Sequence, residues 1–489
     1  MNVAIVASEC APFAKTGGLA DVVGALPKSL EHLGADVRVF LPKYNTVDES
    51  KYTLHYQYNI GEMPIRVGGI PWPVHVLRSS IPGSSVPVYF IDCPHFFHRG
   101  KIYTNDSDED RRFILFTKGV IEALQRLQWT PDVIHCNDWQ TGLLPVMVKD
   151  NYAWDQLFAA TGTLYSIHNI GYQGLFARSA ADAAEMGPRN ADALAMYLGV
   201  SFMKGGILFS EILSTVSETY AKEILTPQFG SGMESDLARR RDDLYGVLNG
   251  IDVDDWNPAT DPHLPHHYSV TSLDVKRRNK QFLLDKIGME YNADRPLIGV
   301  ISRLVAQKGF DLVAGAAERL MELDAQWVIL GSGEDSFENL FSSLHYARPQ
   351  NVWSYIGFNN ELAHLIEAAS DMFLMPSQYE PCGLNQMYSL RYGSIPIVRN
   401  TGGLADTVHD WHEHQARGST EGNGFLFDDA TPYALYTTVE RAVNTFYIDK
   451  DAWRQMMING MSADYSWDSS ARKYMRLYEM AMEKRRLSQ

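Results

Sequence analysis

Two stretches of the chain, residues 16–21 and 401–406, share the six-residue sequence TGGLAD. Each copy follows an apolar, strand-like run and precedes a helical pattern. Loops between a parallel strand and the next helix are where open α/β sheets bind ligands. Glycines let the backbone approach a ligand closely, and the first N–H groups of a helix attract anionic or hydroxyl-rich groups. The copies therefore predict two ligand-binding loops, although either could be only a tight turn.

Cations accompany these loops. Lys15 precedes the first copy, where the second copy has Asn400, and Arg303 and Lys308 flank a short loop in "SRLVAQKG" after a predicted strand. The planar fork of Arg and the mobile charge of Lys together suit a diphosphate, although such a pair can also be plain surface. The formal net charge of −16 argues against a nucleic-acid surface and leaves any anionic ligand to these local cations.

Polar residues follow other predicted strands. Glu380 opens "EPCGL", where a carboxylate beside proline and glycine can bind sugar hydroxyls. Asp138 lies in "HCNDWQ", and His168 and Asn169 lie in "SIHNIGYQG". A histidine in such a position is more often structural than catalytic. These residues are candidates for binding a hydroxyl-rich substrate.

Metal and cofactor signatures are weak. In "DSDED" the pair Asp106 and Asp108 fits a helix start better than a metal site, and "HDWHEH" at 409–414 is predicted to be a solvated loop. The four cysteines are scattered without a C-x-x-C pair, which indicates buried thiols in a reducing compartment. G-x-S-x-G, Walker A, G-x-G-x-x-G and H-E-x-x-H motifs do not occur in the sequence. We expect no metal and no cofactor.

Two large lobes are the simplest arrangement for 489 residues. Buried strand patterns recur in both halves, from "NVAIVASE" to "EILSTVSE" and from "PLIGVISRL" to "IPIVRNTGG", and predict an α/β fold with two doubly wound domains. The halves meet in "NGIDVDDWNPATDPHLPHH", where a turn at Asn249 and three prolines interrupt regular structure.

The final stretch predicts a helix with one apolar face, formed by Tyr474, Leu477, Tyr478 and Ala481, which must dock on another part of the protein. Transmembrane runs and a signal peptide are not recognisable in the sequence, so we expect a cytoplasmic protein.

Seven motifs, in order over residues 1 to about 480, resemble those of the bacterial glycogen synthases and plant starch synthases: "KTGGLADV", "HCNDWQTGLLP", "SIHNIGYQGLF", "LNGIDVDDWNP", "SRLVAQKGFDL", "EPCGLNQMYSLRYG" and "NTGGLADTV". The resemblance implies the GT-B architecture, in which two Rossmann-like lobes flank an interdomain cleft. It implies an N-terminal acceptor-side domain at 1–255, a hinge at 256–274, a donor-nucleotide domain at 275–460, and a C-terminal helix at 461–489 that returns to the N-terminal lobe.

The same resemblance implies transfer of glucose from ADP-glucose to the nonreducing-end 4-hydroxyl of an α-1,4-glucan, with retention of the anomeric configuration. Glu380, Arg303, Lys308 and His168 would be catalytic. The implied substrate-binding residues are Lys15, Gly17, Gly18, Asp21, Tyr103, Asp138, Asn169, Asn249, Cys382, Gly383, Leu384, Thr401 and Gly402. Lys15, Arg303 and Lys308 would neutralise the donor diphosphate, and Glu380 would hold the donor glucose.

Two positions bear on this resemblance. Asn137 stands where the family often has a second histidine, and Tyr388 stands where many retaining GT-B enzymes have a second glutamate. The tyrosine is usual in the bacterial and plant branch and favours ADP-glucose over UDP-glucose. Since an obvious carboxylate pair is lacking, the expected mechanism is front-face attack, with the main-chain carbonyl of His168 supporting the developing cation.

Two other functions remain open from the sequence. One is a GT-B transferase with another acceptor, such as sucrose or a lipid, although the sequence shows no basic or amphipathic membrane face. The other is a non-catalytic, two-lobed sugar-binding protein. The expected partners are ADP-glucose and an α-1,4-glucan, with no nucleic acid and no membrane.

Overall fold

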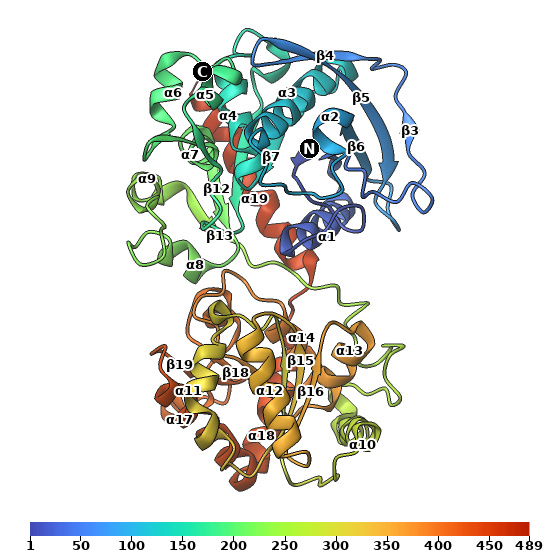
Figure 1. Cartoon of the computed structure of the whole chain (residues 1–489), viewed down its shortest axis with the longest axis vertical. Coiled ribbons are helices and arrows are strands. Elements are labelled where there is room, and N and C mark those ends of the chain that lie inside the picture. Colours follow the sequence, from blue (N-terminus) through green and yellow to red (C-terminus); the bar gives the residue numbers. More distant parts are fainter. Residues whose placement is uncertain (489) are drawn as a thin grey trace. The chain divides into compact units, whose positions relative to one another are not determined.

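The structure is a computed structural model that describes residues 1–488 and divides into two compact units (Figure 1). Unit 1 comprises Met1–Val216, Ala221–Gly250 and the segment that starts at Trp467, and unit 2 comprises Ser217–Tyr220 and Ile251–Ser466. Across residues 1–488, no helix is both long and apolar enough to cross a membrane.

Unit 1 is built on one large sheet of mostly parallel strands. In spatial order the strands are β13 (Leu244–Gly246), β12 (Ile212–Thr215), β8 (Gly162–Ile167), β7 (Val133–Asn137), β1 (Asn2–Val6), β2 (Asp36–Pro42), β6 (Pro87–Asp92), β5 (Ile70–Ser80) and β3 (His55–Tyr56), with β4 (Met63–Val67) paired to β5. Strands β13 to β6 are parallel, and β7, β8 and β12 are buried at every position, as continuous apolar runs predict. Strands β9 (Leu175–Ala177), β10 (Ala195–Met196) and β11 (Gly199–Ser201) form a small separate sheet.

Helices join the strands of unit 1. They are α1 (Gly18–His32), α2 (Pro94–Phe97), α3 (Glu109–Leu127), α4 (Leu143–Lys149), α5 (Ser179–Ala183), α6 (Pro188–Ala193), α7 (Phe202–Phe209), α9 (Glu234–Arg239) and α19 (Trp467–Leu487). Helix α8 (Glu218–Glu223) is divided, because residues 218–220 are grouped with unit 2 and residues 221–223 with unit 1. Helix α19, red in Figure 1, packs against α1 and β8. Tyr474 and Tyr478 of α19 are fully buried, and the Tyr478 hydroxyl lies 2.9 Å from Nδ1 of His135 in β7.

Unit 2 has a six-stranded, fully parallel sheet. Its spatial order is β16 (Val352–Ile356), β15 (Gln326–Gly331), β14 (Leu297–Ile301), β17 (Met372–Met375), β18 (Ile395–Arg399) and β19 (Phe425–Phe427). Its helices are α10 (Lys276–Ile287), α11 (Phe310–Leu320), α12 (Asp335–Ala347), α13 (Asn360–Ala369), α14 (Asn385–Tyr392), α15 (Gly402–Thr407), α16 (Trp411–Ala416), α17 (Pro432–Ile448) and α18 (Lys450–Ser462). Separate apolar clusters include Ile298 and Val300 in one, and Leu297 in the other, so β14 contributes side chains to both. The predicted doubly wound α/β fold is confirmed.

The segment expected to be a hinge packs within unit 2. The Trp256 ring stacks on the rings of Tyr388 and His364, with both centroid distances 3.8 Å. Asp261, completely buried, lies 2.8 Å from Nδ1 of His364 and accepts a hydrogen bond from the Tyr392 hydroxyl at 2.6 Å. Residues 256 and 261 therefore pack against other residues of unit 2.

Two local expectations differ from the structure. The antiparallel strands β3, β4 and β5 were not expected; β4 alternates between buried and exposed positions, a pattern that suits a sheet with one solvated face. The expectation of a solvated loop at 409–414 is wrong, because α16 begins at Trp411 and Asp410 caps it by accepting from the N–H groups of His412 and Glu413.

Candidate functional site

The candidate residues of unit 1 follow parallel strands at the carboxyl edge of the large sheet. Lys15 lies in the loop after β1, Asp138 directly follows β7, and His168 directly follows β8. Asn249 comes after β13, three residues beyond that strand. Parallel strands end at one edge, so residues from distant parts of the sequence are brought to the same side of the sheet.

Glu9 organises the first TGGLAD loop. This side chain is 4% exposed, and its carboxylate accepts hydrogen bonds from the main-chain N of Thr16 at 2.5 Å and of Gly17 at 3.1 Å. The Thr16 hydroxyl donates to it at 2.7 Å and the Tyr103 hydroxyl at 2.6 Å. Burial raises the pKa of Tyr103, so the phenol remains a proton donor. Glu9 therefore ties the Tyr103 loop to the glycine loop.

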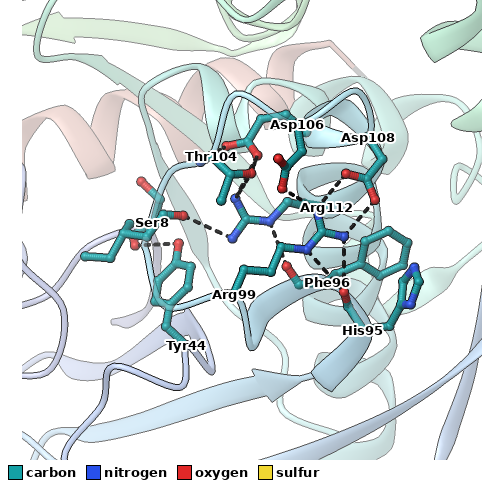
Figure 2. A network of polar contacts seen from close by, with 11 residues as sticks. Ser8, Tyr44, His95, Phe96, Arg99, Thr104, Asp106, Asp108 and Arg112 are labelled. Carbon is teal, nitrogen blue, oxygen red and sulfur yellow. Dashed lines mark hydrogen bonds and ion pairs between the residues drawn. The ribbon is translucent and has the colours of Figure 1, made fainter.

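A pair of arginines fixes the loop that carries Tyr103 (Figure 2). Arg112 is fully buried and donates to the main-chain oxygens of Phe96 at 2.7 Å and Ile102 at 3.0 Å. Arg99 donates to Asp108 through two nitrogens, at 2.6 and 2.7 Å, and to Asp106 at 3.0 Å. Such forked, charge-assisted contacts hold a loop in one geometry. Asp106 and Asp108 therefore both accept hydrogen bonds from Arg99.

Asp138 has a positive φ angle and a shifted side-chain pKa. Its φ is 57°, which is strained for a residue with a side chain. Its carboxylate accepts from the main-chain N of His168 at 2.8 Å, yet burial raises its pKa to about 7. Burial also lowers the pKa of His168 to about 4, so that imidazole is neutral at pH 7. Strain and shifted pKa values together are typical of functional positions.

A cavity of about 430 Å³ lies beside the first glycine loop and is lined by residues that include Lys15, Thr16, Lys101 and Tyr103. The Lys15 side chain is 54% exposed, and its ammonium group is 2.6 Å from Asp21. An ideal Cβ on Gly17 or Gly18 meets no described atom within 4 Å, so these glycines border open space.

Asn249 offers a second indication of a ligand. It is 8% exposed, and its buried side-chain oxygen accepts no hydrogen bond from residues 1–488. A buried carbonyl without a donor is costly unless a ligand or water supplies one. Asn169 is fixed differently, since its side-chain oxygen accepts from the main-chain N of Gly171 at 2.9 Å.

In unit 2, Glu380 and Lys308 form the centre of a second cavity, of about 200 Å³, which is also lined by Arg303, Gly383 and Leu384. Lys308 Nζ lies 2.6 Å from Glu380 Oε2, and the Ser377 hydroxyl donates to the same oxygen at 2.9 Å. Arg303 is exposed and makes no ion pair with the described residues. The cavity therefore combines an unpaired cation with a paired one beside a nearly buried carboxylate.

The second TGGLAD copy packs behind Glu380. Gly402 has φ 48°, and an ideal Cβ on it would lie 1.9 Å from the main-chain oxygen of Glu380. A Cβ on Gly403 would lie 1.9 Å from the oxygen of Cys382, and the Gly403 N–H donates to Glu380 O at 3.1 Å. Thr401 is 1% exposed, at the N-cap of α15. The second pair of glycines thus allows close backbone contact within the protein.

The structure gathers the predicted residues of each unit at the carboxyl edge of its own sheet. The sequence reasoning missed Glu9 and Lys101. Glu9 directly ends the "NVAIVASE" run, and this position could have signalled it, whereas Lys101 had no motif. Within residues 1–488, no group of three or more His, Cys, Asp or Glu side chains is placed to hold a metal ion.

Comparison with protein families gives two matches. Residues 2–239 match the starch synthase catalytic domain, and residues 286–455 match the glycosyl transferases group 1 family. Together the two models span most of both units.

Full-length relatives agree with these models. The chain is similar to the glycogen synthase of Geotalea uraniireducens, with 46% identity over 99% of this chain and 100% of the relative, and to that of Geotalea daltonii, with 43% identity over the same shares. The catalytic domain of starch synthase IV from Arabidopsis thaliana, solved with ADP and acarbose, is 36% identical, has a TM-score of 0.87 and covers 99% of each chain. A sucrose-phosphate synthase from Thermosynechococcus elongatus shares the fold, with a TM-score of 0.60 at 15% identity over 98% of each chain.

Proposed function

Because this chain belongs to the family of bacterial glycogen synthases and plant starch synthases, we propose that the two sheet edges described above act together in one glucosyl transfer. The protein is a GT-B glycosyltransferase with glycogen synthase function. Its donor is ADP-glucose and its acceptor is the nonreducing end of an α-1,4-glucan. The observation that carries the donor assignment is the cavity of unit 2, where Arg303 is unpaired and Lys308 lies beside Glu380.

The cavity of unit 2 supplies the groups for the donor. Arg303 and Lys308 neutralise the diphosphate, and their contact with charge that grows on the leaving group lowers the barrier. Glu380 and the main-chain N–H groups of residues 382–384, at the start of α14, bind the hydroxyls of the donor glucose. Thr401 and Gly402 approach the phosphates from the next loop.

The nucleotide base requires a flat apolar partner, and Phe358 is suited to this role. It follows β16 at the carboxyl edge of the same sheet, two strands from β14, and is 84% exposed. A large exposed aromatic ring at this edge of the sheet provides a face for stacking. We assign adenine to this ring.

The edge of unit 1 supplies the acceptor side. Asp138, Asn249 and Tyr103 bind hydroxyls of the transferred glucose or of the glucan, and the unsatisfied oxygen of Asn249 is the clearest site for a hydroxyl donor. Lys15 adds a third cation for the diphosphate, and Gly17 and Gly18 leave room for it.

The reaction proceeds on one face of the sugar. The acceptor 4-hydroxyl attacks the anomeric carbon as the bond to the β-phosphate oxygen breaks, and the hydroxyl proton passes to that leaving oxygen. The main-chain carbonyl of His168 supports the positive charge that develops on the sugar ring. Configuration is retained because attack and departure take place on the same face.

Release of ADP tests the function directly. We expect ADP to form from ADP-glucose with glycogen as the acceptor, and to form more slowly from water alone. ADP release only with a different acceptor would identify another GT-B transferase. Tight binding of ADP-glucose without turnover would identify a sugar-binding protein.

A second measurement tests whether cations of the protein neutralise the diphosphate. Activity is expected to persist in EDTA, since Lys15, Arg303 and Lys308 supply positive charge. ADP is expected to lower the radius of gyration in solution scattering, because the proposal brings groups of both units to one substrate. Loss of activity in EDTA that Mg²⁺ restores would contradict the first part, and an unchanged radius of gyration would contradict the second.

A further inference from the structure

Asn137 is the last residue of β7, and its side chain is completely buried. The side-chain amide has three partners, which are two main-chain carbonyl oxygens and one imidazole ring. Its Nδ2 lies 3.1 Å from the main-chain oxygen of Val6 and 3.3 Å from that of His135. Its Oδ1 lies 2.9 Å from Nε2 of His168. These contacts are within one unit and connect β1 and β7 with the residue that directly follows the neighbouring strand β8.

The two main-chain contacts determine how the amide is oriented. Carbonyl oxygens only accept hydrogen bonds, so the NH₂ group must face Val6 and His135. The amide oxygen is then the group that faces His168, and it too only accepts. The Nε2 atom of His168 must therefore carry a proton. In a neutral imidazole the other nitrogen, Nδ1, then holds the lone pair.

We propose that Asn137 is a positioning residue that fixes the His168 ring in the neutral tautomer with its proton on Nε2, so that Nδ1 can accept a hydrogen bond from a sugar hydroxyl. The last step rests on the proposed function, which brings a sugar to this edge. A hydrogen-bonded partner on the far nitrogen commonly sets the tautomer of a functional histidine.

The ionisable groups around the His168 ring are consistent with a neutral imidazole. Asp138 contacts the main-chain N of His168 at 2.8 Å, not its ring, and Glu9 acts on Asp138 through space. His135, whose main-chain oxygen contacts the Asn137 amide, has a pKa lowered to about 3 by burial and is also neutral. Asn137 contributes no charge of its own, and a carboxylate at this position would favour imidazolium.

The direct test is ¹⁵N NMR of histidine-labelled full-length protein, with the His168 signals assigned by their loss in His168→Gln. The proposal expects the shifts of an Nε2-protonated neutral ring from pH 8 down to pH 5.5. A ring protonated on Nδ1, or on both nitrogens at pH 7, would overturn it without any further variant.

Two nearly isosteric variants extend the test. Asn137→Leu removes the acceptor, so the Nε2-protonated fraction should fall and kcat should drop about tenfold, by the loss of one hydrogen bond. Asn137→Asp should raise the pKa of His168 by about one unit or more, as a nearby opposite charge does. The matched control is Asn279→Asp, a fully buried asparagine in unit 2 that bonds only to the main chain of His266.

The outcomes separate this inference from the proposed function. Unchanged His168 shifts in both Asn137 variants would overturn the inference even if the wild-type protein releases ADP from ADP-glucose. Absence of ADP release by the wild type would overturn the proposed function while the tautomer assignment could still be measured and stand.

Discussion

The two TGGLAD copies have the same sequence and opposite surroundings. In unit 1, Gly17 and Gly18 border open space, since a Cβ on either would meet no described atom within 4 Å. In unit 2, a Cβ on Gly402 or Gly403 would lie 1.9 Å from a main-chain oxygen. The Cβ positions of the first pair face open space, and those of the second pair are filled by the protein's own backbone.

The polar residues in and beside the two copies also differ in their contacts. Lys15 and Asp21 of the first copy pair with each other at the surface. Asn400 beside the second copy donates to Asp428 at 2.8 Å, and Asp406 accepts from the hydroxyl of Thr219, which is grouped with unit 2. One motif thus forms a loop that borders open space in unit 1 and a packing support for Glu380 in unit 2.

The largest expected effect is the difference in activity loss between a substitution of Lys308 in unit 2 and one of Lys15 in unit 1. Lys308→Ala should lower kcat about 100- to 1,000-fold, as the loss of one preorganised charge at a leaving group does. The ammonium group of Lys308 lies against nearly buried Glu380, whereas Lys15 is more exposed and pairs at the surface. Lys15→Ala should therefore cost only about tenfold. Steady-state ADP release measures both, and equal losses would contradict the distinction.

The next largest effect is expected when a glycine of either TGGLAD copy is substituted. Gly403→Ala should destabilise unit 2 by about 1–3 kcal/mol, because its methyl group must displace the backbone at Cys382. Gly18→Ala, at the first position of α1, should leave stability within about 1 kcal/mol and lower the activity instead. Thermal and denaturant unfolding of both variants, beside activity, measures the difference. Equal destabilisation would show that the two copies are equivalent.

Glu9 tests whether the first loop depends on its carboxylate. Glu9→Gln keeps an acceptor oxygen for the N–H groups of Thr16 and Gly17 but places an NH₂ donor against the hydroxyls of Thr16 and Tyr103, which donate to the carboxylate in the wild type. We expect kcat/KM to fall about 5- to 30-fold, the cost of one poorly satisfied buried group. Glu31→Gln, at a partly exposed position of α1 where the carboxylate accepts from the Ser85 hydroxyl, is the matched control and should keep wild-type kinetics.

The smallest effect concerns pH and should arise in unit 1. Asp138 has a pKa raised to about 7 by burial, so its carboxylate is present above that pH and is protonated below it. If the carboxylate is the active form, kcat/KM should fall to about half of its alkaline plateau near pH 7 and continue to fall in acid. A pH–rate profile from 6 to 9 measures this, and a flat profile would remove Asp138 from that role.

The sequence alone determined the parallel strands and the class of fold. Runs of buried β-branched residues fit a parallel sheet that is covered on both faces. Candidate residues that follow such strands lie at the carboxyl edge of that sheet. Asp138, His168, Arg303 and Glu380 were found on this basis. The antiparallel β3–β5 region was missed because β4 and β5 are interrupted by prolines and exposed residues.

Only the tertiary structure decided what identical motifs do. The glycines of the two copies cannot be distinguished in the sequence, because the clash that requires glycine at 402 and 403 comes from the backbone at 380–382. The same holds for Glu9 and Asn137, whose partners lie in loops or strands far along the chain. The sequence determines which donor, acceptor or charged groups each residue carries. The fold decides which partners those groups contact, because the partners lie in segments that are far apart in the sequence.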